Sequence, residues 1–121
     1  MRIIYCDDES NQRELVSVML EFHYKKHNSV RIETLQCAHE LRSVEGNVSL
    51  LISDGNMRSS TYADVLRYRQ ERFSTTPIII YSGDDLLVDK LQRDGISAVI
   101  KSSGITPLLE AIEKELRLIR R

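Results

Sequence analysis

Four short apolar runs, each ending abruptly at a charged or turn-forming residue, constrain the fold of this chain most. The runs and the residues that follow them are 3–6 before Asp7 and Asp8, 50–53 before Asp54, 78–81 before Ser82 and Gly83, and 97–100 before Lys101. Such runs are typical of buried β-strands. In an open α/β sheet the carboxyl ends of parallel strands share one edge, where ligands bind. We therefore expect three carboxylates, a hydroxyl and an ammonium group to meet there.

Amphipathic stretches separate these runs and predict helices. The predicted strands are 2–6, 30–35, 48–53, 78–81 and 97–100, and the predicted helices are 11–25, 38–45, 62–72, 84–94 and a last one with Pro107 in its first turn. Alternating strands and helices predict an α/β fold, a doubly wound parallel sheet with right-handed crossovers. Five strands and five helices suit the flavodoxin-like order 2-1-3-4-5, which is taken from the general case. That order places Asp7 and Asp8 beside Asp54.

The helical patterns also predict which side chains face the core. In the first helix, the spacing of four apolar residues predicts an inward face made of Leu15, Val18, Met19 and Phe22. In the last helix, Ile112, Leu116 and Ile119 form one stripe. This stripe is either core or the seam of a homodimer.

Composition bounds the class of protein. The chain has 121 residues, of which 41% are hydrophobic and 29% charged, and a formal net charge of −1. This predicts one domain over residues 1–121, without a basic field for direct binding of nucleic acid or a membrane surface. No apolar stretch approaches the roughly 20 residues of a membrane span, and the first apolar run is too short for a signal peptide. We therefore expect a cytoplasmic protein whose Cys6 and Cys37 are free thiols.

The expected cluster has the chemistry of phosphoryl transfer. Asp7, Asp8 and Asp54 would repel one another unless a divalent cation relieved the repulsion, and a carboxylate-rich set of oxygen ligands fits Mg²⁺. Lys101 supplies a positive charge for phosphate, and the hydroxyl of Ser82 can donate to a phosphoryl oxygen. Aspartate is a known phosphoryl acceptor, and Asp54 lies centrally in the expected cluster.

These residues resemble the receiver domain of two-component response regulators. The resemblance spans the whole chain and rests on Asp7-Asp8, Asp54, Ser82-Gly83 and Lys101, each after its strand. The stretch 54–57 (Asp-Gly-Asn-Met) is similar to that around the phosphoacceptor of the chemotaxis regulator. The resemblance implies a phosphorylation-dependent signalling switch, not a turnover enzyme. Its partners would be a histidine kinase or phosphotransfer protein and an unknown downstream protein target or fused output domain.

The resemblance also implies a role for each site residue. Asp54 would take the phosphoryl group, and Lys101 would pair with it. Asp8, Asp54 and the backbone carbonyl of Asn56 would bind Mg²⁺, with Asp7 acting through a bound water. Ser82 would swing toward the phosphoryl group as the switch. The positions that tune the lifetime of the phosphoryl group would be Asn56 and Asp84.

Three positions depart from the pattern of that family. Ser102 follows Lys101 where the family usually has a proline with a cis bond, so a trans or looser loop is expected. Ala98 stands where the family commonly has a Tyr or Phe that couples to the switch. The loop 58–63 (Arg-Ser-Ser-Thr-Tyr-Ala) replaces the usual proline and Asp-Gly turn, so a different shape is expected beside the site.

Three alternatives remain at this point. The chain could be a phosphorylation-independent interaction module whose acidic site is vestigial. A hydrolase of the haloacid dehalogenase type would need a second Asp two residues after the nucleophile, where this chain has Asn56. A nucleotide-binding flavodoxin relative would need N–H donors after the first strand, where Asp7 and Asp8 stand.

Overall fold

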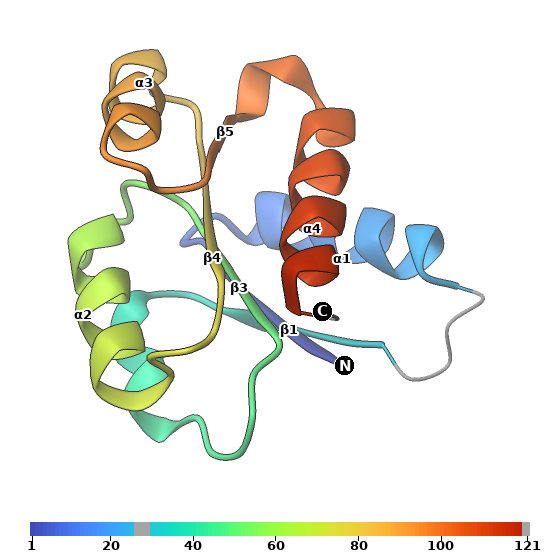
Figure 1. Cartoon of the computed structure of the whole chain (residues 1–121), viewed down its shortest axis with the longest axis vertical. Helices are drawn as coiled ribbons and strands as arrows, with labels where there is room; N and C mark the ends of the chain where they lie inside the picture. The colour runs from blue at the N-terminus through green and yellow to red at the C-terminus, as the bar shows by residue number, and fades with distance from the viewer. Residues whose placement is uncertain (26–29, 120–121) are drawn as a thin grey trace.

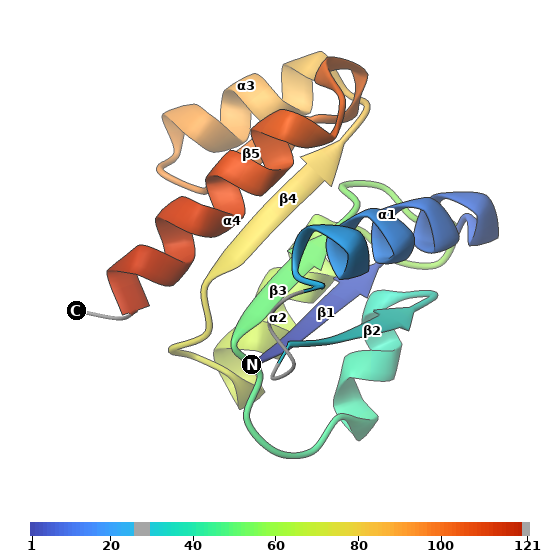
Figure 2. The ribbon, with the colours of Figure 1, turned by 90° about the vertical axis from the view of Figure 1, so that its right-hand side faces the viewer.

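The computed structural model describes residues 1–25 and 30–119 and shows one parallel sheet. The strands are β1 (Arg2–Cys6), β2 (Arg31–Leu35), β3 (Leu50–Ser53), β4 (Ile78–Ser82) and β5 (Ala98–Ile100). Their order is β2-β1-β3-β4-β5, and every neighbouring pair is parallel. The predicted fold class and strand order are confirmed. Figure 2 shows β1, β3 and β4 pointing the same way, so their carboxyl ends gather at one edge of the sheet.

Helices connect the strands and cover both faces of the sheet (Figure 1). They are α1 (Ser10–His23), η1 (Ala38–Ser43), α2 (Tyr62–Arg72), α3 (Asp85–Arg93), η2 (Lys101–Ser103) and α4 (Ile105–Ile119). The second of the five predicted helices is the 3₁₀ helix η1. Its buried residues Ala38 and Leu41 are three apart, which is the spacing that aligns side chains in a 3₁₀ helix. The short turn η2 occupies a segment that was predicted to be a loop.

The core has two layers, one on each face of the sheet. Helices α1 and α4 pack on one face, and η1, α2 and α3 pack on the other (Figure 1). Alternate strand residues serve the two layers: Ile3 and Tyr5 face α1 and α4, whereas Ile4 and Cys6 face the opposite side. The inner strands β1, β3 and β4 are therefore largely apolar on both faces, as parallel strands between helices are.

The predicted inward face of α1 is wrong for three of its residues. Leu15, Val18 and Phe22 are 53%, 56% and 77% exposed, whereas Val16 and Leu20 are buried. Helix α1 carries two apolar stripes about 100° apart, and helical periodicity does not say which of them meets the sheet. The outward stripe of Leu15, Val18 and Phe22 is called the α1 stripe below.

Helix α4 uses its apolar stripe for the core. Ile112 and Leu116 are buried against the sheet, so the core alternative holds for these two residues. The side chain of Ile119 lies outside the described part of the structure. Among the described residues, no helix combines the length and apolarity that crossing a membrane requires.

Candidate functional site

Three carboxylates meet at the carboxyl edge of the sheet. Asp7 and Asp8 follow β1, and Asp54 follows β3, its neighbour in the sheet. One oxygen from each of the three lies within 4.8 Å of the others. Asp7 is fully buried, and Asp54 is only 8% exposed. The predicted juxtaposition is confirmed, and oxygen ligands at this spacing fit a hard divalent cation such as Mg²⁺.

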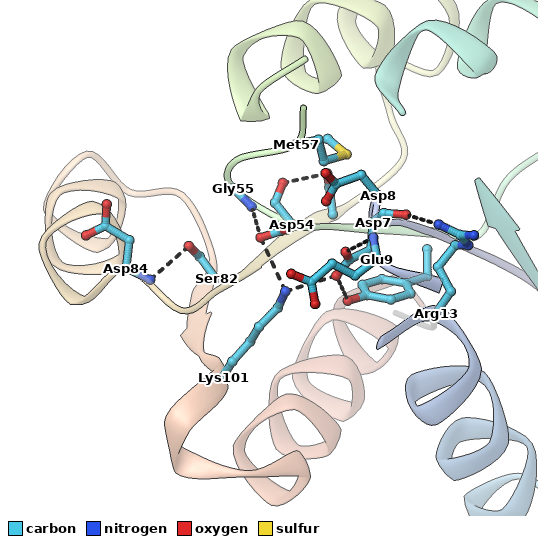
Figure 3. A network of polar contacts seen from close by, with 12 residues as sticks. Asp7, Asp8, Glu9, Arg13, Asp54, Gly55, Met57, Ser82, Asp84 and Lys101 are labelled. Carbon is cyan, nitrogen blue, oxygen red and sulfur yellow. Dashed lines mark hydrogen bonds and ion pairs between the residues drawn. The ribbon is translucent and has the colours of Figure 1, made fainter. Parts of the chain in front are cut away.

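Asp7 is held by a network of donors (Figure 3). Its Oδ2 accepts hydrogen bonds from the Tyr5 hydroxyl at 2.5 Å and from Lys101 Nζ at 2.9 Å. Its Oδ1 accepts from the backbone N–H of Glu9 at 3.0 Å, and Arg13 donates to its carbonyl oxygen at 2.8 Å. Burial, and then the hydrogen bond to Asp7, raise the pKa of Tyr5, so its hydroxyl remains a donor. Asp7 is therefore fixed in place by donors on both carboxylate oxygens.

Lys101 joins two of the carboxylates (Figure 3). Its Nζ lies 2.9 Å from Asp7 Oδ2 and 3.4 Å from Asp54 Oδ1. Burial opposes its charged form, but the hydrogen bond with Asp7 and the charges of Asp54 and Asp7 outweigh burial, so the pKa of Lys101 is raised. The site thus holds a permanent positive charge beside Asp54.

Asp54 is the central carboxylate of the cluster. Its backbone N–H donates to the carbonyl of Cys6 at 2.8 Å, and its Oδ1 accepts from the N–H of Gly55 at 2.8 Å. Burial raises the pKa of Asp54, the charge of Lys101 opposes that effect, and the net pKa is raised. The hydrogen bond from Gly55 and the ion pair with Lys101 both fall on Oδ1 of Asp54. The other carboxylate oxygen lies on the side of Asp8 (Figure 3).

The structure ties Ser82 and Asp84 to the start of α3. The buried Ser82 Oγ accepts a hydrogen bond from the N–H of Asp84 at 3.1 Å. The carboxylate of Asp84 accepts from the N–H groups of Leu86 and Leu87, which makes it the N-cap of α3. Both side chains lie on the α3 side of Lys101 (Figure 3). Ser82 thus makes its hydrogen bond within the β4–α3 turn.

The three departures from the family pattern lie around this site. Ala98 is buried in β5 beside Ile80 and contributes only a methyl group, at the position where the resemblance to receiver domains implies a Tyr or Phe in most members. None of the described peptide bonds is cis, including the one before Ser102. The loop after Met57 is closed by an antiparallel bridge between Asn56 and Thr61. The exposed Asn56 therefore sits at the root of that loop.

Three contributors to the site were missed in the sequence. Tyr5 carries a detectable signal, because it lies two residues before Asp7 on one strand and so shares its face. Arg13 and Arg58 carry none, since a single arginine in a helix or a loop is ordinary. Arg58 lies beside Asp8, to whose Oδ2 its backbone N–H donates at 3.0 Å.

Gly55 permits close packing next to Asp54. A Cβ at this position would lie 2.6 Å from Leu87 Cδ2 and 2.9 Å from Ser82 Oγ. We expect Gly55→Ala to lower the free energy of unfolding by about 1–3 kcal/mol, because the side chains of Leu87 and Ser82 must shift to relieve the overlap. Urea unfolding monitored by circular dichroism measures this.

Gly83→Ala is the matched control, because a Cβ on Gly83 meets no atom within 4 Å. The free energy of unfolding of Gly83→Ala should stay within about 0.5 kcal/mol of the wild-type value. Equal destabilisation by the two variants would contradict the close approach at Gly55.

Known structures share this fold and are modestly similar in sequence. The Thermotoga maritima response regulator TrrA, solved in complex with Mg²⁺-BeF, is 25% identical, with a TM-score of 0.79 over 95% of this chain and 98% of that one. A response regulator receiver domain from Clostridium thermocellum is 19% identical, with a TM-score of 0.80 over 98% of this chain and 96% of that one. The Vibrio cholerae chemotaxis protein CheY4 is 22% identical, with a TM-score of 0.76 over 95% of this chain and 98% of that one.

Comparisons of sequence alone give a different result, because no protein-family model and no curated protein matches the chain. The structural matches nevertheless cover nearly all of it, and many of the matched structures are response regulator receiver domains. They agree with the resemblance predicted from Asp7-Asp8, Asp54, Ser82 and Lys101. The chain therefore has the CheY-like fold of the response regulator receiver domain.

Proposed function

We propose that this chain, over residues 1–121, is a receiver domain that accepts a phosphoryl group on Asp54 and so switches its binding of a partner. One observation carries the proposal: a nearly buried Asp54 lies within 4.8 Å of two further carboxylates and 3.4 Å from Lys101. A nucleophile, a place for a divalent cation and a fixed positive charge are the parts that phosphoryl transfer requires.

The chemistry assigned to Asp54 is a displacement at phosphorus. Its Oδ2 forms the new O–P bond while the bond to the donor breaks, and the electron pair of that bond leaves with the donor. From a phosphohistidine of a kinase or phosphotransfer protein, the pair returns to the imidazole nitrogen. The raised pKa of Asp54 means that the nucleophile is lost, as the pH falls, earlier than for an ordinary carboxyl group.

The neighbouring residues prepare Asp54 for this reaction. Asp8, Asp54 and the carbonyl of Asn56 would hold Mg²⁺, with Asp7 acting through water, and the ion would neutralise charge on the phosphoryl oxygens. Lys101, already 2.9 Å from Asp7, would pair with a phosphoryl oxygen. The exposed Asn56 and Asp84 would tune the lifetime of the product. This makes the chain a signalling domain that assists its own phosphorylation, not a turnover enzyme.

Ser82 would be the switch. Its hydroxyl accepts the N–H of Asp84, so a move toward a phosphoryl group gives up that bond and disturbs the cap of α3. The buried Ala98 supplies no aromatic ring to carry the change toward α4. The conformational change would therefore emerge through α3.

The experiment that tests the proposal is intact-mass measurement after incubation with acetyl phosphate. With Mg²⁺ present, wild type should gain the mass of one phosphoryl group, and chelation of Mg²⁺ should prevent the gain. No gain in the presence of Mg²⁺ would refute the proposal.

Ala98 also favours a second candidate, a phosphorylation-independent interaction module. Without an aromatic ring at this buried position, part of the expected switch is missing. The two candidates differ in the affinity of a bound partner with and without beryllofluoride, a mimic of the phosphoryl group. Equal affinities would favour the module, and unequal affinities the switch.

The α1 stripe is the surface that we assign to the phosphodonor protein, in a cytoplasmic setting. Leu15 lies at a groove of about 300 Å³, mainly apolar, whose lining includes Lys101, Gly104 and Ile105. A protein that delivers a phosphoryl group to Asp54 must cover the surface next to Lys101, and this groove is continuous with it. An apolar helix face of the partner would fit this groove and stripe.

We expect Leu15→Glu to slow phosphotransfer from the cognate kinase at least tenfold, because the charge would be buried under the partner. The rate with acetyl phosphate should not change, since a small donor needs no docking surface. Leu86→Glu, at an 82% exposed leucine in the first turn of α3, is the control. Equal effects of the two variants on the kinase reaction would contradict the assignment.

A further inference from the structure

Arg58 lies beside Asp8 with its backbone held by a hydrogen bond and its side chain exposed to solvent. Its N–H donates to Asp8 Oδ2 at 3.0 Å, and its Nε lies 3.8 Å from the same oxygen. The side chain is 95% exposed. This guanidinium can therefore leave Asp8 while the backbone remains in place.

The loop that carries Arg58 is held at several points. The N–H of Met57 donates to the carbonyl of Ser60 at 2.9 Å, and the N–H of Ala38 donates to Ser60 Oγ at 3.0 Å. Met57 is buried, and Asn56 pairs with Thr61 across the root of the loop. Truncating the side chain of Arg58 should leave these contacts intact.

The acidic side chains of the site outnumber the positively charged ones, which gives the Arg58 guanidinium a role in attracting anions. Asp7, Asp8 and Asp54 are three acidic side chains in close proximity. Lys101, whose Nζ lies 2.9 Å from Asp7, contributes one positive charge. A phosphodonor is itself an anion and must approach this excess of negative charge. Among the described residues, Arg58 is the cation that forms an ion pair with Asp8.

We propose that Arg58 is the receiving residue for small anionic acyl phosphates, and that it competes with the divalent cation for Asp8. The donor half of this proposal rests on the proposed function of Asp54. When a cation binds at Asp8, like charge repels the guanidinium, which turns outward to meet the donor. Asp54 then attacks phosphorus, the bond from phosphorus to the acyl oxygen breaks, and the carboxylate product leaves with the electron pair.

The two halves predict effects of opposite sign for Arg58→Ala. Mg²⁺ should bind about two- to fivefold tighter, because a competing cation at a solvent-exposed pair is gone. Phosphorylation by acetyl phosphate at saturating Mg²⁺ should be about five- to tenfold slower at low salt, and the difference should shrink as salt screens the contact. A residue that merely supported the loop would weaken both.

The experiment combines calorimetric Mg²⁺ titration with the rate of phosphoryl gain, at low and high salt. Arg58→Lys should retain both wild-type properties. Arg93→Ala is the matched control, since Arg93 is 71% exposed and lies 3.6 Å from Asp89 on α3. It should change neither quantity.

Four possible results decide the proposal. Weaker Mg²⁺ binding in Arg58→Ala, or a rate equal to wild type, would overturn it. Tighter Mg²⁺ binding together with a slower, salt-dependent rate would support it. If wild type gains no phosphoryl group at all, the proposed function and the donor role fall together, and the calorimetric comparison alone decides the competition for Asp8.

Discussion

Asp54→Asn should abolish the phosphoryl gain that acetyl phosphate and Mg²⁺ produce in wild type. An amide is not a nucleophile toward phosphorus at neutral pH, and it removes one of the three charges that attract the cation. Intact-mass spectrometry measures the loss. Asp89→Asn, on an exposed part of α3, should gain the phosphoryl group at the wild-type rate. A persistent gain in Asp54→Asn would assign the reaction to another residue.

The same substitution should stabilise the fold near neutral pH. Burial raises the pKa of Asp54 in the folded state above the unfolded value, so its ionised form opposes folding. Stability is therefore lost as the pH rises from the unfolded pKa through the raised folded pKa. Asp54→Asn removes this cost, on the order of 1 kcal/mol, and its thermal midpoint should exceed that of wild type above this pH window. Equal thermal midpoints of wild type and Asp54→Asn at every pH would contradict the claim that ionised Asp54 opposes folding.

Lys101→Ala should slow phosphorylation by about 100-fold, because it removes the positive charge that would stabilise the phosphoryl group in the transition state. It should also lower the free energy of unfolding by about 2–4 kcal/mol, since the fully buried Asp7 loses its cation. The charge of Lys101 lowers the pKa of Asp54, so its loss should move the acid limb of the pH–rate profile to higher pH. Mass spectrometry of samples quenched at successive times, repeated over a range of pH, measures the phosphorylation rate and its pH dependence.

Lys90→Ala is the control for Lys101→Ala. Lys90 is an exposed residue of α3, so its removal should leave the rate and the pH profile unchanged. A Lys101→Ala protein that is phosphorylated at the wild-type rate would remove Lys101 from the chemistry and leave it a structural role beside Asp7.

The strands and the residues that end them could be predicted from short-range signals, whereas the order of the strands was taken from the general case for this kind of sheet. Apolar runs mark buried strands, and the strand order then carries Asp7, Asp8, Asp54 and Lys101 to one edge. The connection between a run and the residue that ends it is local, so it is visible in the sequence.

The errors arose where two solutions satisfy the same local pattern. Helix α1 has two adjacent apolar stripes, and only packing against β1 and α4 selects Val16 and Leu20 over the α1 stripe. The hydrogen bonds from the N–H of Asp84 to Ser82 Oγ and from the N–H of Arg58 to Asp8 Oδ2 depend on loop geometry. No periodicity records that geometry, so the present positions of the Ser82 hydroxyl and the exposed Arg58 side chain could not be predicted.

The central claim is that Asp54 is the phosphoacceptor, and the most direct test is to locate the phosphoryl group in wild type. After phosphorylation with acetyl phosphate and Mg²⁺, borohydride reduction converts an aspartyl phosphate to homoserine, which peptide mass spectrometry can place in the sequence. The proposed function predicts homoserine at position 54, and none when Mg²⁺ is chelated. Homoserine at position 7 or 8, or at no position, would contradict it.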